Sequence, residues 1–320
     1  MKRAPSLTVL ALAGGLALAA GLVLLLKGTP PAWAAPPALP PSAPQPQATT
    51  DRYVSITGTD SGDCSSPSAP CRTIQYAVDQ ATPGDRILVS GGVFTGMASE
   101  VVRVNKSLTF EGGYTTDFTS RDPESFPTIV DGEGARRGFT IGGWWWEWPT
   151  VSIDGFHIRN GYGNGQGGGL FVMYASVTLT NVQVYSNTAT TTDWGSGGGL
   201  YADSCRLSIY ASSFTTNTAS ANSGGNGGGM YVYFCAPVEI VSSTVRANIA
   251  AGNTTGWDSG YGGGIYAYAY GYSEFVLQDN EISENIANNG SNGEGNGGGL
   301  FISGSYYRLE GNRIAANRGG

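Results

Sequence analysis

Charged residues are scarce in this chain of 320 residues. Asp, Glu, Lys and Arg make up 13% of it, with 17 basic against 24 acidic residues. No run of basic residues occurs, which argues against nucleic acid or anionic lipid as a partner. The 40% share of hydrophobic residues is too high for a disordered chain, and 50 glycines are too many for a helical one. The composition therefore predicts a folded protein made mostly of strands and turns.

Motifs that hold metals or nucleotides are also missing. The chain has one histidine, His157, and a lone histidine is most often an ordinary solvated side chain. The glycine-rich stretches lack the regular aspartates of calcium-binding nonapeptide repeats. The stretch at residues 161–169 looks like GxGxxG, but no strand-to-helix unit follows it. We therefore expect no metal site and no cofactor, with calcium as the one ion left open.

The first 50 residues have the features of an export segment and a tether. Two basic residues precede an apolar run at residues 7–26, and Ala32-Trp33-Ala34 is a small-x-small cleavage site. We assign residues 1–34 to a signal peptide, or to a signal anchor, because the run is long enough to span a bilayer. Proline-rich residues 35–50 predict an extended linker. The remainder is expected outside the cell or at its surface, with membrane contact only through an uncleaved N-terminal segment.

Glycine triplets mark an internal repeat of 30 or 35 residues. An apolar residue, an aromatic residue and a second small or apolar residue follow each triplet, as in Leu200-Tyr201-Ala202. A second alternating pair comes next, and then a short segment that ends in asparagine, such as FTTN up to Asn217. Three short strands per unit without a helical period predict one coil of a parallel β-helix. The triplets are residues 167–169, 197–199, 227–229, 262–264 and 297–299.

Stacked coils turn each column of the repeat into a ladder, because equivalent residues then lie about 4.8 Å apart. We expect the asparagines to stack at a bend in left-handed backbone, and the glycines to turn a corner at positive φ. Upstream, apolar residues from Ile74 to Ala81 share one helical face. A short helix near residues 73–81 is therefore expected to cover the open end of the first coil.

These motifs resemble known families. The glycine triplet followed by Leu, Met or Ile, and the (Val/Phe/Ile)-x-x-Asn segment, resemble the GGA(I/L/V) and FxxN repeats of the polymorphic outer membrane proteins, which are surface adhesins on a right-handed parallel β-helix. Residues 53–96 (YVSITG…VFTG) are similar to the opening of bacterial exported proteins with pectate-lyase-like repeats. The resemblance covers about residues 52–320. It implies the fold more than the function, because this superfamily includes adhesins, lyases and hydrolases.

The expected fold class is therefore all-β, a right-handed parallel β-helix (solenoid) of roughly eight coils with a short N-terminal capping helix. Residues 51–84 are assigned to the cap and residues 85–320 to the β-helix, with regular repeats from about residue 151.

Two disulfides are expected, in keeping with an exported protein. Cys64 and Cys71 flank a turn that contains proline. Cys205 and Cys235 each lie six residues after the last glycine of a triplet, so they occupy neighbouring coils at a spacing that suits a disulfide.

A catalytic cluster is not visible in the repeat. Lyases of this fold hold calcium with several carboxylates beside a base, and hydrolases use two or three aspartates. The outward columns that can be aligned, one from His157 to Arg313 and one from Asp154 to Glu310, bring no two acidic residues into neighbouring coils. We therefore name no catalytic residue.

Aromatic residues give the stronger surface signal. If Leu200 and Ala202 point inward, Tyr201 points outward and belongs to a column of five stacked aromatics, near Tyr233, Tyr268, Tyr270 and Tyr272. Such a ladder either stabilises the stack or forms a strip for sugar rings or a protein partner. The WWWEW stretch either folds over an apolar flank or forms an exposed platform. The candidate binding residues are Phe171, Tyr201, Tyr231, Tyr266, Phe301, Trp144, Trp145, Trp146 and Trp148.

The sequence thus favours an exported protein that binds a polysaccharide or a surface protein through a lateral aromatic face without catalysis. Two alternatives stay open. One is a polysaccharide lyase or glycoside hydrolase of the pectate-lyase-like superfamily. The other is a structural surface spacer.

Overall fold

The computed structural model describes residues 49–253, 258–269, 274–291, 293–304 and 306–320. The chain divides into two compact units, and the second, residues 46–320, contains all of these. The predicted signal segment (1–34) and nearly all of the predicted linker (35–50) lie outside the described residues. No helix within the described ranges is long and apolar enough to cross a membrane.

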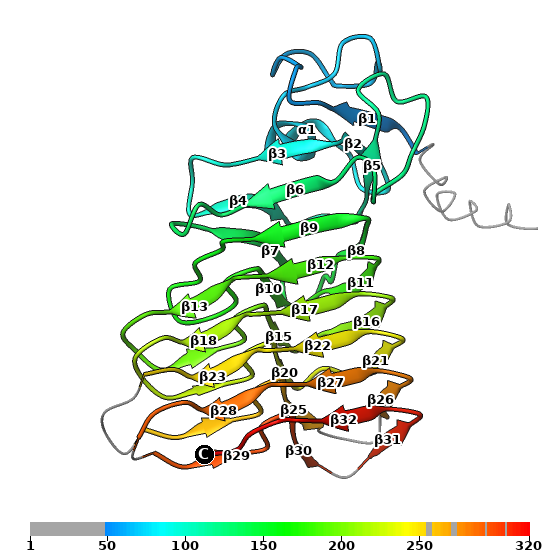
Figure 1. Cartoon of the computed structure of the whole chain (residues 1–320). Coiled ribbons are helices and arrows are strands. Elements are labelled where there is room, and N and C mark those ends of the chain that lie inside the picture. Colours follow the sequence, from blue (N-terminus) through cyan, green and yellow to red (C-terminus); the bar gives the residue numbers. More distant parts are fainter. Residues whose placement is uncertain (1–48, 254–257, 270–273, 292, 305) are drawn as a thin grey trace, which may run out of the picture. The chain divides into compact units, whose positions relative to one another are not determined.

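Parallel strands stack coil upon coil into three long sheets, which we call A, B and C (Figure 1). Each complete coil contributes one strand to each sheet, in the order A, B, C along the chain. The winding is right-handed, the hand that parallel crossovers favour. Sheet B holds eight strands among the described residues, in agreement with the expected number of coils.

The strand bounds follow the sheets. Sheet A contains β1 (Asp51–Val54), β2 (Arg86–Ser90), β5 (Leu108–Tyr114), β8 (Thr150–Asp154), β11 (Ser176–Thr180), β16 (Arg206–Tyr210), β21 (Val238–Val241), β26 (Phe275–Gln278) and β31 (Tyr307–Glu310). Sheet B contains β3 (Gly92–Phe94), β6 (Thr128–Asp131), β9 (Phe156–Arg159), β12 (Gln183–Tyr185), β17 (Ser213–Thr215), β22 (Thr244–Arg246), β27 (Glu281–Ser283) and β32 (Arg313–Ala315). Sheet C contains β4 (Glu100–Val104), β7 (Arg137–Gly142), β10 (Leu170–Met173), β15 (Leu200–Asp203), β20 (Met230–Tyr233), β25 (Ile265–Ala269) and β30 (Leu300–Gly304).

Two small sheets lie between sheets B and C in the later coils. One is formed by β13 (Thr188–Thr190), β18 (Thr218–Ser220), β23 (Ile249–Ala251) and β28 (Ile286–Asn288). The other is formed by β14 (Gly195–Ser196), β19 (Gly225–Asn226), β24 (Gly260–Tyr261) and β29 (Gly295–Asn296).

The core follows the alternation of each strand. Leu200 and Ala202 of β15 are completely buried, and so are their register partners in β10, Leu170 and Val172. Because parallel in-register stacking puts like residues on top of one another, each inward column is a continuous apolar stack. Burying such columns along the whole solenoid is the main source of its stability.

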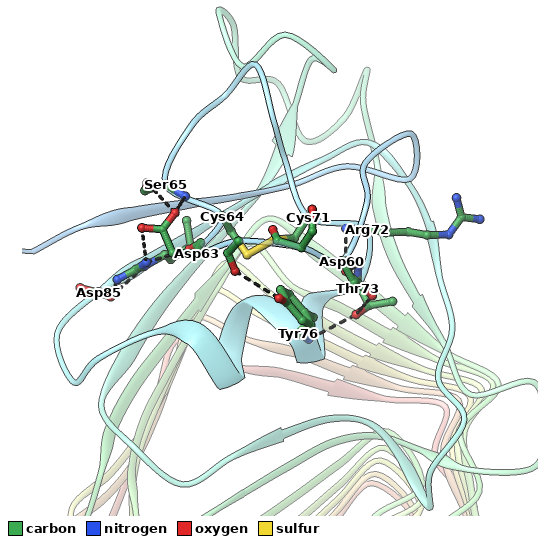
Figure 2. Close-up of a disulfide and its surroundings, with 12 residues drawn as sticks. Asp60, Asp63, Cys64, Ser65, Cys71, Arg72, Thr73, Tyr76 and Asp85 are labelled. Atoms are coloured by element: carbon green, nitrogen blue, oxygen red, sulfur yellow. Dashed lines mark hydrogen bonds and ion pairs between the residues drawn. A yellow bond between two sulfur atoms is a disulfide. The ribbon is translucent and has the colours of Figure 1, made fainter.

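The helix α1 (Ile74–Gln80) caps the first coil, which confirms the expected helix near residues 73–81. The side chain of Thr73 caps it by accepting a hydrogen bond from the Tyr76 N–H at 3.2 Å. Its buried residues, Ile74, Ala77 and Val78, pack towards β1, β2 and β4. Figure 2 shows the predicted Cys64–Cys71 disulfide beside the helix, where the Tyr76 hydroxyl donates to the Gly62 carbonyl at 3.1 Å.

The glycine triplets turn a corner, as expected. The first glycine of each triplet has positive φ, for example 65° at Gly197. The next two lie against neighbouring backbone: a Cβ on Gly198 would lie 2.4 Å from the Thr218 carbonyl oxygen, and one on Gly199 would lie 2.6 Å from that of Gly229. Positive φ at the first position and close packing at the other two therefore both require glycine.

The asparagine ladder forms, but the expected left-handed backbone lies one residue earlier. Asn217 is completely buried, and its neighbour Thr216 has a φ of 54°. The reason is that the asparagine side chain must point inward to bond to adjacent coils, so the preceding residue makes the turn. Asn160, which stands one place early in its coil, is itself left-handed with a φ of 51°. The other left-handed residues of the column are Ser186, Ala247, Glu284 and Ala316.

The second predicted disulfide is also present. Cys205 and Cys235 follow strands β15 and β20 and link neighbouring coils, with Cα atoms 4.3 Å apart. Both pairs of cysteines are therefore oxidised, and the described residues contain no free cysteine.

Candidate binding site

The aromatic column stacks as predicted. Strand register pairs Phe171 with Tyr201, Tyr201 with Tyr231, and onward through Tyr266 to Phe301. Neighbouring ring centroids lie 5.0 to 5.2 Å apart with interplanar angles of 6 to 9°. We call this column the aromatic ladder. Its rings lie face to face, so each inner ring has both faces covered by its neighbours.

The second ring of the ladder, Tyr201, has little accessible surface. Tyr201 points away from the core, yet only 6% of the residue is exposed. Its hydroxyl donates to Asp203 Oδ2 at 3.2 Å, and burial, followed by nearby Asp203 and Tyr231, raises its pKa. Tyr201 therefore points outward as expected, but stacking covers both faces of its ring and leaves little of it accessible. A binding role for the ladder residues stays a prediction.

The ends and flanks of the ladder have other partners. The guanidinium of Arg137 lies over the Phe171 ring, 4.8 Å from its centroid. Tyr233 packs beside Tyr231 with centroids 5.8 Å apart and beside Tyr268 at 5.3 Å. The two other tyrosines named for this region, Tyr270 and Tyr272, lie outside the described residues.

The WWWEW stretch is an exposed hairpin and not a flap over an apolar flank. Trp144, Trp145 and Trp146 are 66%, 72% and 63% exposed. The Trp144 N–H donates to the Glu147 carbonyl at 3.2 Å, and the Glu147 N–H donates back at 2.9 Å. Trp144 and Trp146 stack with centroids 5.4 Å apart, and Trp145 meets Trp146 edge to face. We call residues 143–149 the tryptophan hairpin.

Trp148 lies apart from the other indoles, contrary to the extended backbone that would put Trp144, Trp146 and Trp148 on one face. The tight turn changes this alternation. Trp148 is 36% exposed, its Nε1–H donates to the Trp145 carbonyl at 3.3 Å, and the Arg206 guanidinium lies 5.8 Å from its ring centroid.

A cleft of about 400 Å³ opens beside the hairpin. Trp144, Glu147 and Trp148 contribute to its lining, and Arg103 and Lys106 face them from the preceding coil. A smaller hollow of about 210 Å³ shares Arg103, Gly142 and Gly143 with this cleft and reaches Phe171, the first ring of the ladder. The structure thus brings the two predicted aromatic groups to one continuous surface. We call the larger hollow the tryptophan cleft.

Basic side chains give the tryptophan cleft a positive character in an otherwise acidic chain. The Arg103 side chain is 64% exposed and donates one hydrogen bond, from Nε to Glu100 Oε1 at 2.5 Å. The ammonium of Lys106 donates to the carbonyls of Val78 and Ala81 at the end of α1, at 3.0 and 2.8 Å. Sequence reasoning missed both residues, because they are distant from the tryptophans in sequence and only the coil geometry brings them together.

The acidic residues that come together in the two aligned columns are held in ion pairs. The two aligned columns have the predicted register, but Glu111 of the preceding coil lies beside Asp154, so two acidic residues do occupy neighbouring coils. Glu111 pairs with Arg86 at 3.0 Å, and Asp154 with Arg121 at 3.0 Å. These pairings match structural ion pairs better than a catalytic dyad. Within the described ranges, no group of three or more His, Cys, Asp and Glu side chains is placed to hold a metal ion.

Comparison with known proteins does not identify a family for this chain. No protein-family model matches the chain, and no curated protein matches it. Among solved structures, the crystal structure of pectate lyase Pel9A matches with a TM-score of 0.32 and 16% identity, covering 83% of this chain and 80% of that one. A likeness at this level carries no argument about activity. The stacked parallel sheets themselves define the class of fold, a right-handed parallel β-helix.

Proposed function

We propose that this protein is an exported β-helix that recognises carbohydrate without cleaving it, through the tryptophan hairpin and the tryptophan cleft. The observation that carries the proposal is the exposure of three adjacent indole rings, each more than 60% accessible, in a hairpin whose Trp144 lines a cleft of about 400 Å³. Large aromatic side chains gathered on a surface mark an interaction site, because leaving them in water is unfavourable.

The chemistry of the rim suits sugar rings. Flat indole faces pack against the apolar faces of pyranose rings, while polar groups at the edge bond to hydroxyls. The stacked pair Trp144 and Trp146 is held by the hairpin hydrogen bonds, so little side-chain freedom is lost on binding. Arg103 and Lys106 on the opposite wall favour a sugar that carries a carboxylate, because charge-assisted hydrogen bonds are the stronger ones.

The rest of the molecule supports this role. Stacking in the aromatic ladder keeps sheet C regular up to the coil that bears the hairpin. Two disulfides are compatible with an extracellular location, and the apolar N-terminal segment of the sequence supports export.

The test is a binding comparison on carboxylated and neutral polysaccharides, such as polygalacturonate and dextran, followed by isothermal titration calorimetry. We expect the double variant Trp144→Ala/Trp146→Ala to weaken binding at least tenfold. The matched control is Trp194→Ala, since Trp194 is 46% exposed but lies outside the cleft lining. Arg103→Gln should weaken binding of the carboxylated polymer more than that of the neutral one. Equal affinity for the wild type and the double variant would contradict the proposal.

The enzyme and spacer alternatives are separated by two further measurements. Depolymerisation assays with the same polymers, with and without calcium, would show specific turnover if the protein were a lyase or a hydrolase. The absence of binding to any polymer or surface protein would instead favour a structural spacer.

A further inference from the structure

A second polar hollow lies on sheet B, away from the tryptophan cleft that adjoins sheet C. It has a volume of about 280 Å³ and is lined by Asp122, Pro123, Glu124, His157, Asn181 and Gln183. We call it the histidine pocket. It contains the only histidine of the chain, which the proposed function does not use.

One wall of the histidine pocket is a loop fastened to the body of the solenoid. Arg121 anchors this loop between β5 and β6 by donating from Nε to the Gly112 carbonyl at 2.9 Å and pairing with Asp154 at 3.0 Å. Pro123 then packs on Gly155, where a Cβ would lie only 2.7 Å from Pro123 Cγ. The position equivalent to Gly155 in the next coil is Asn181, so glycine at this corner is what admits the loop.

Of the two carboxylates in this loop, Asp122 holds the turn and Glu124 is free to contact a ligand. Asp122 accepts hydrogen bonds from the N–H groups of Glu124 and Ser125 at 3.1 and 3.3 Å, and from the Ser125 hydroxyl at 2.7 Å. These bonds hold the turn and lower the pKa of Asp122. Asp122 is therefore a structural element of the wall, while the Glu124 side chain has no such structural task.

The opposite wall comes from two neighbouring coils. His157 on β9 is in register with Gln183 on β12, and the ring of Tyr185 meets the imidazole edge to face with centroids 6.2 Å apart. Burial lowers the pKa of His157, and nearby Arg159 lowers it further. The imidazole is therefore neutral at pH 7, with one nitrogen that donates and one that accepts a hydrogen bond.

The polar groups that converge on the pocket lack partners. Among the described residues, no hydrogen bond is recorded for the His157 ring, the Glu124 carboxylate, or the side-chain amides of Asn181 and Gln183. His157 is half-buried, and Glu124, Asn181 and Gln183 are exposed, so none of these groups would have to break an internal hydrogen bond to bind a ligand in the hollow.

We propose that the histidine pocket binds a neutral, hydroxyl-rich ligand, such as a single uncharged sugar unit, independently of the tryptophan cleft. Hydroxyl groups both donate and accept, which matches a neutral imidazole, a carboxylate and two carboxamides. No lysine or arginine lines the pocket, and the Glu124 carboxylate repels an anionic ligand. An apolar ligand would leave all four polar groups unpaired. The volume lies just below the usual range of about 300 to 1,000 Å³ for ligand pockets, so one small unit fits.

Binding in the histidine pocket can be measured through the NMR signals of its histidine. The imidazole proton signals of the full chain belong to His157 alone, so their NMR shifts report directly on the pocket during titration at neutral pH. The probes are the methyl glycosides of glucose, galactose and mannose, with sodium glucuronate as the anionic comparison. We expect a saturable shift with at least one neutral glycoside and none with glucuronate.

Variants decide whether the shift arises in the pocket. Glu124→Ala and Gln183→Ala should each weaken the response about three- to tenfold, the value of one hydrogen bond. Glu124→Gln should reduce the discrimination against glucuronate without removing it, because one of the two repelling carboxylates is gone and Asp122 remains. The matched control Glu294→Gln, an exposed glutamate outside the pocket, should change nothing.

Two results would overturn the proposal. One is the absence of a saturable shift with every neutral glycoside, and the other is a shift that Glu124→Ala and Gln183→Ala leave unchanged. The double variant Trp144→Ala/Trp146→Ala separates the two sites: it should abolish polysaccharide binding and leave the His157 response intact. Loss of both polysaccharide binding and the His157 response in that variant would show that the two sites are not independent. If the wild type binds no polysaccharide but His157 still responds to a neutral glycoside, the proposed function fails and the proposal for the histidine pocket holds.

Discussion

Replacing Asn217 by alanine tests how the asparagine ladder holds the coils together. The Asn217 side chain is completely buried and makes four hydrogen bonds. Its Oδ1 accepts from the backbone N–H and Nδ2 of Asn187 at 3.1 and 2.9 Å, and its Nδ2 donates to the Val184 carbonyl at 2.9 Å and to Asn248 Oδ1 at 3.0 Å. The side chain thus links three successive coils.

The expected loss follows from the groups left behind. In Asn217→Ala, the Asn187 N–H and the Val184 carbonyl lose this partner, whereas Asn187 Nδ2 keeps the Ile158 carbonyl at 3.0 Å and Asn248 Oδ1 keeps the Asn217 N–H at 2.9 Å. A buried polar group without a partner costs about 1 to 3 kcal/mol, so two of them predict a loss of roughly 2 to 6 kcal/mol in the free energy of unfolding. Partial relaxation and entry of water favour the lower half of that range.

Asn317→Ala is the matched control. Asn317 makes the same kind of bonds, accepting from the N–H and Nδ2 of Asn285 and donating to the Ile282 carbonyl, but it is only half-buried in the last described coil. Water can replace its bonds, so this variant should lose at most about 1 to 2 kcal/mol. The assay is urea unfolding followed by circular dichroism, with hydrogen exchange to detect local opening, because stacked repeats need not unfold in one step. Equal losses in the two variants, or a loss below about 1 kcal/mol in Asn217→Ala, would refute the reasoning.

Two further predictions concern the disulfides and the buried carboxylate of Asp85. Removing the inter-coil disulfide with Cys205→Ala/Cys235→Ala should lower the unfolding free energy by about 3.6 kcal/mol, and removing the other with Cys64→Ala/Cys71→Ala should lower it by about 2.4 kcal/mol. The two disulfides span 30 and 7 residues, and the entropy lost on closing a loop grows with its length. Thermal melts that show the larger loss for Cys64→Ala/Cys71→Ala would contradict this estimate. Asp85 is buried, and although burial raises its pKa, hydrogen bonds from the N–H groups of Thr82 and Thr50 and from Arg52 outweigh this and hold the pKa below the ordinary 3.8. The ionised carboxylate of Asp85 stabilises the fold above pH 3.8, and this contribution is lost as the pH falls through the lowered pKa. Asp85→Asn should therefore make the melting temperature fall less steeply at acid pH. A melting temperature that depends on pH in the same way in the variant and the wild type would argue against this role.

Much of the fold was predictable because the repeat is local and periodic. The positions of Gly197, Leu200 and Asn217 have equivalents in five units of the repeat. Alternation along the short strands predicts which side chains point inward. The capping helix was predictable from a single apolar face between Ile74 and Ala81. The position of the left-handed residue was not, since Thr216 has no sequence feature that distinguishes it from its neighbours.

The candidate sites were only partly predictable. The tryptophans were conspicuous in the sequence, and extended alternation puts Trp144 and Trp146 on one face, where they stack, but it also puts Trp148 there, whereas the hairpin between Trp144 and Glu147 places Trp148 apart from them. The aromatic ladder was predicted from the repeat, whereas the burial of Tyr201 follows from ring stacking, which depends on side-chain torsions that no pattern reports.

By itself, the sequence determined the class of fold, the register of the coils and the pairing of the cysteines, because a repeated pattern constrains every coil in the same way. Only the tertiary structure decided which surfaces can bind. Arg103 and Trp148 line one hollow, and Glu124 and His157 line another, because the hairpin at Trp148 and the loop at Glu124 depart from the repeat and lie against neighbouring coils. Contacts of this kind depend on three-dimensional proximity between residues far apart in the chain, and a periodic sequence pattern does not predict them.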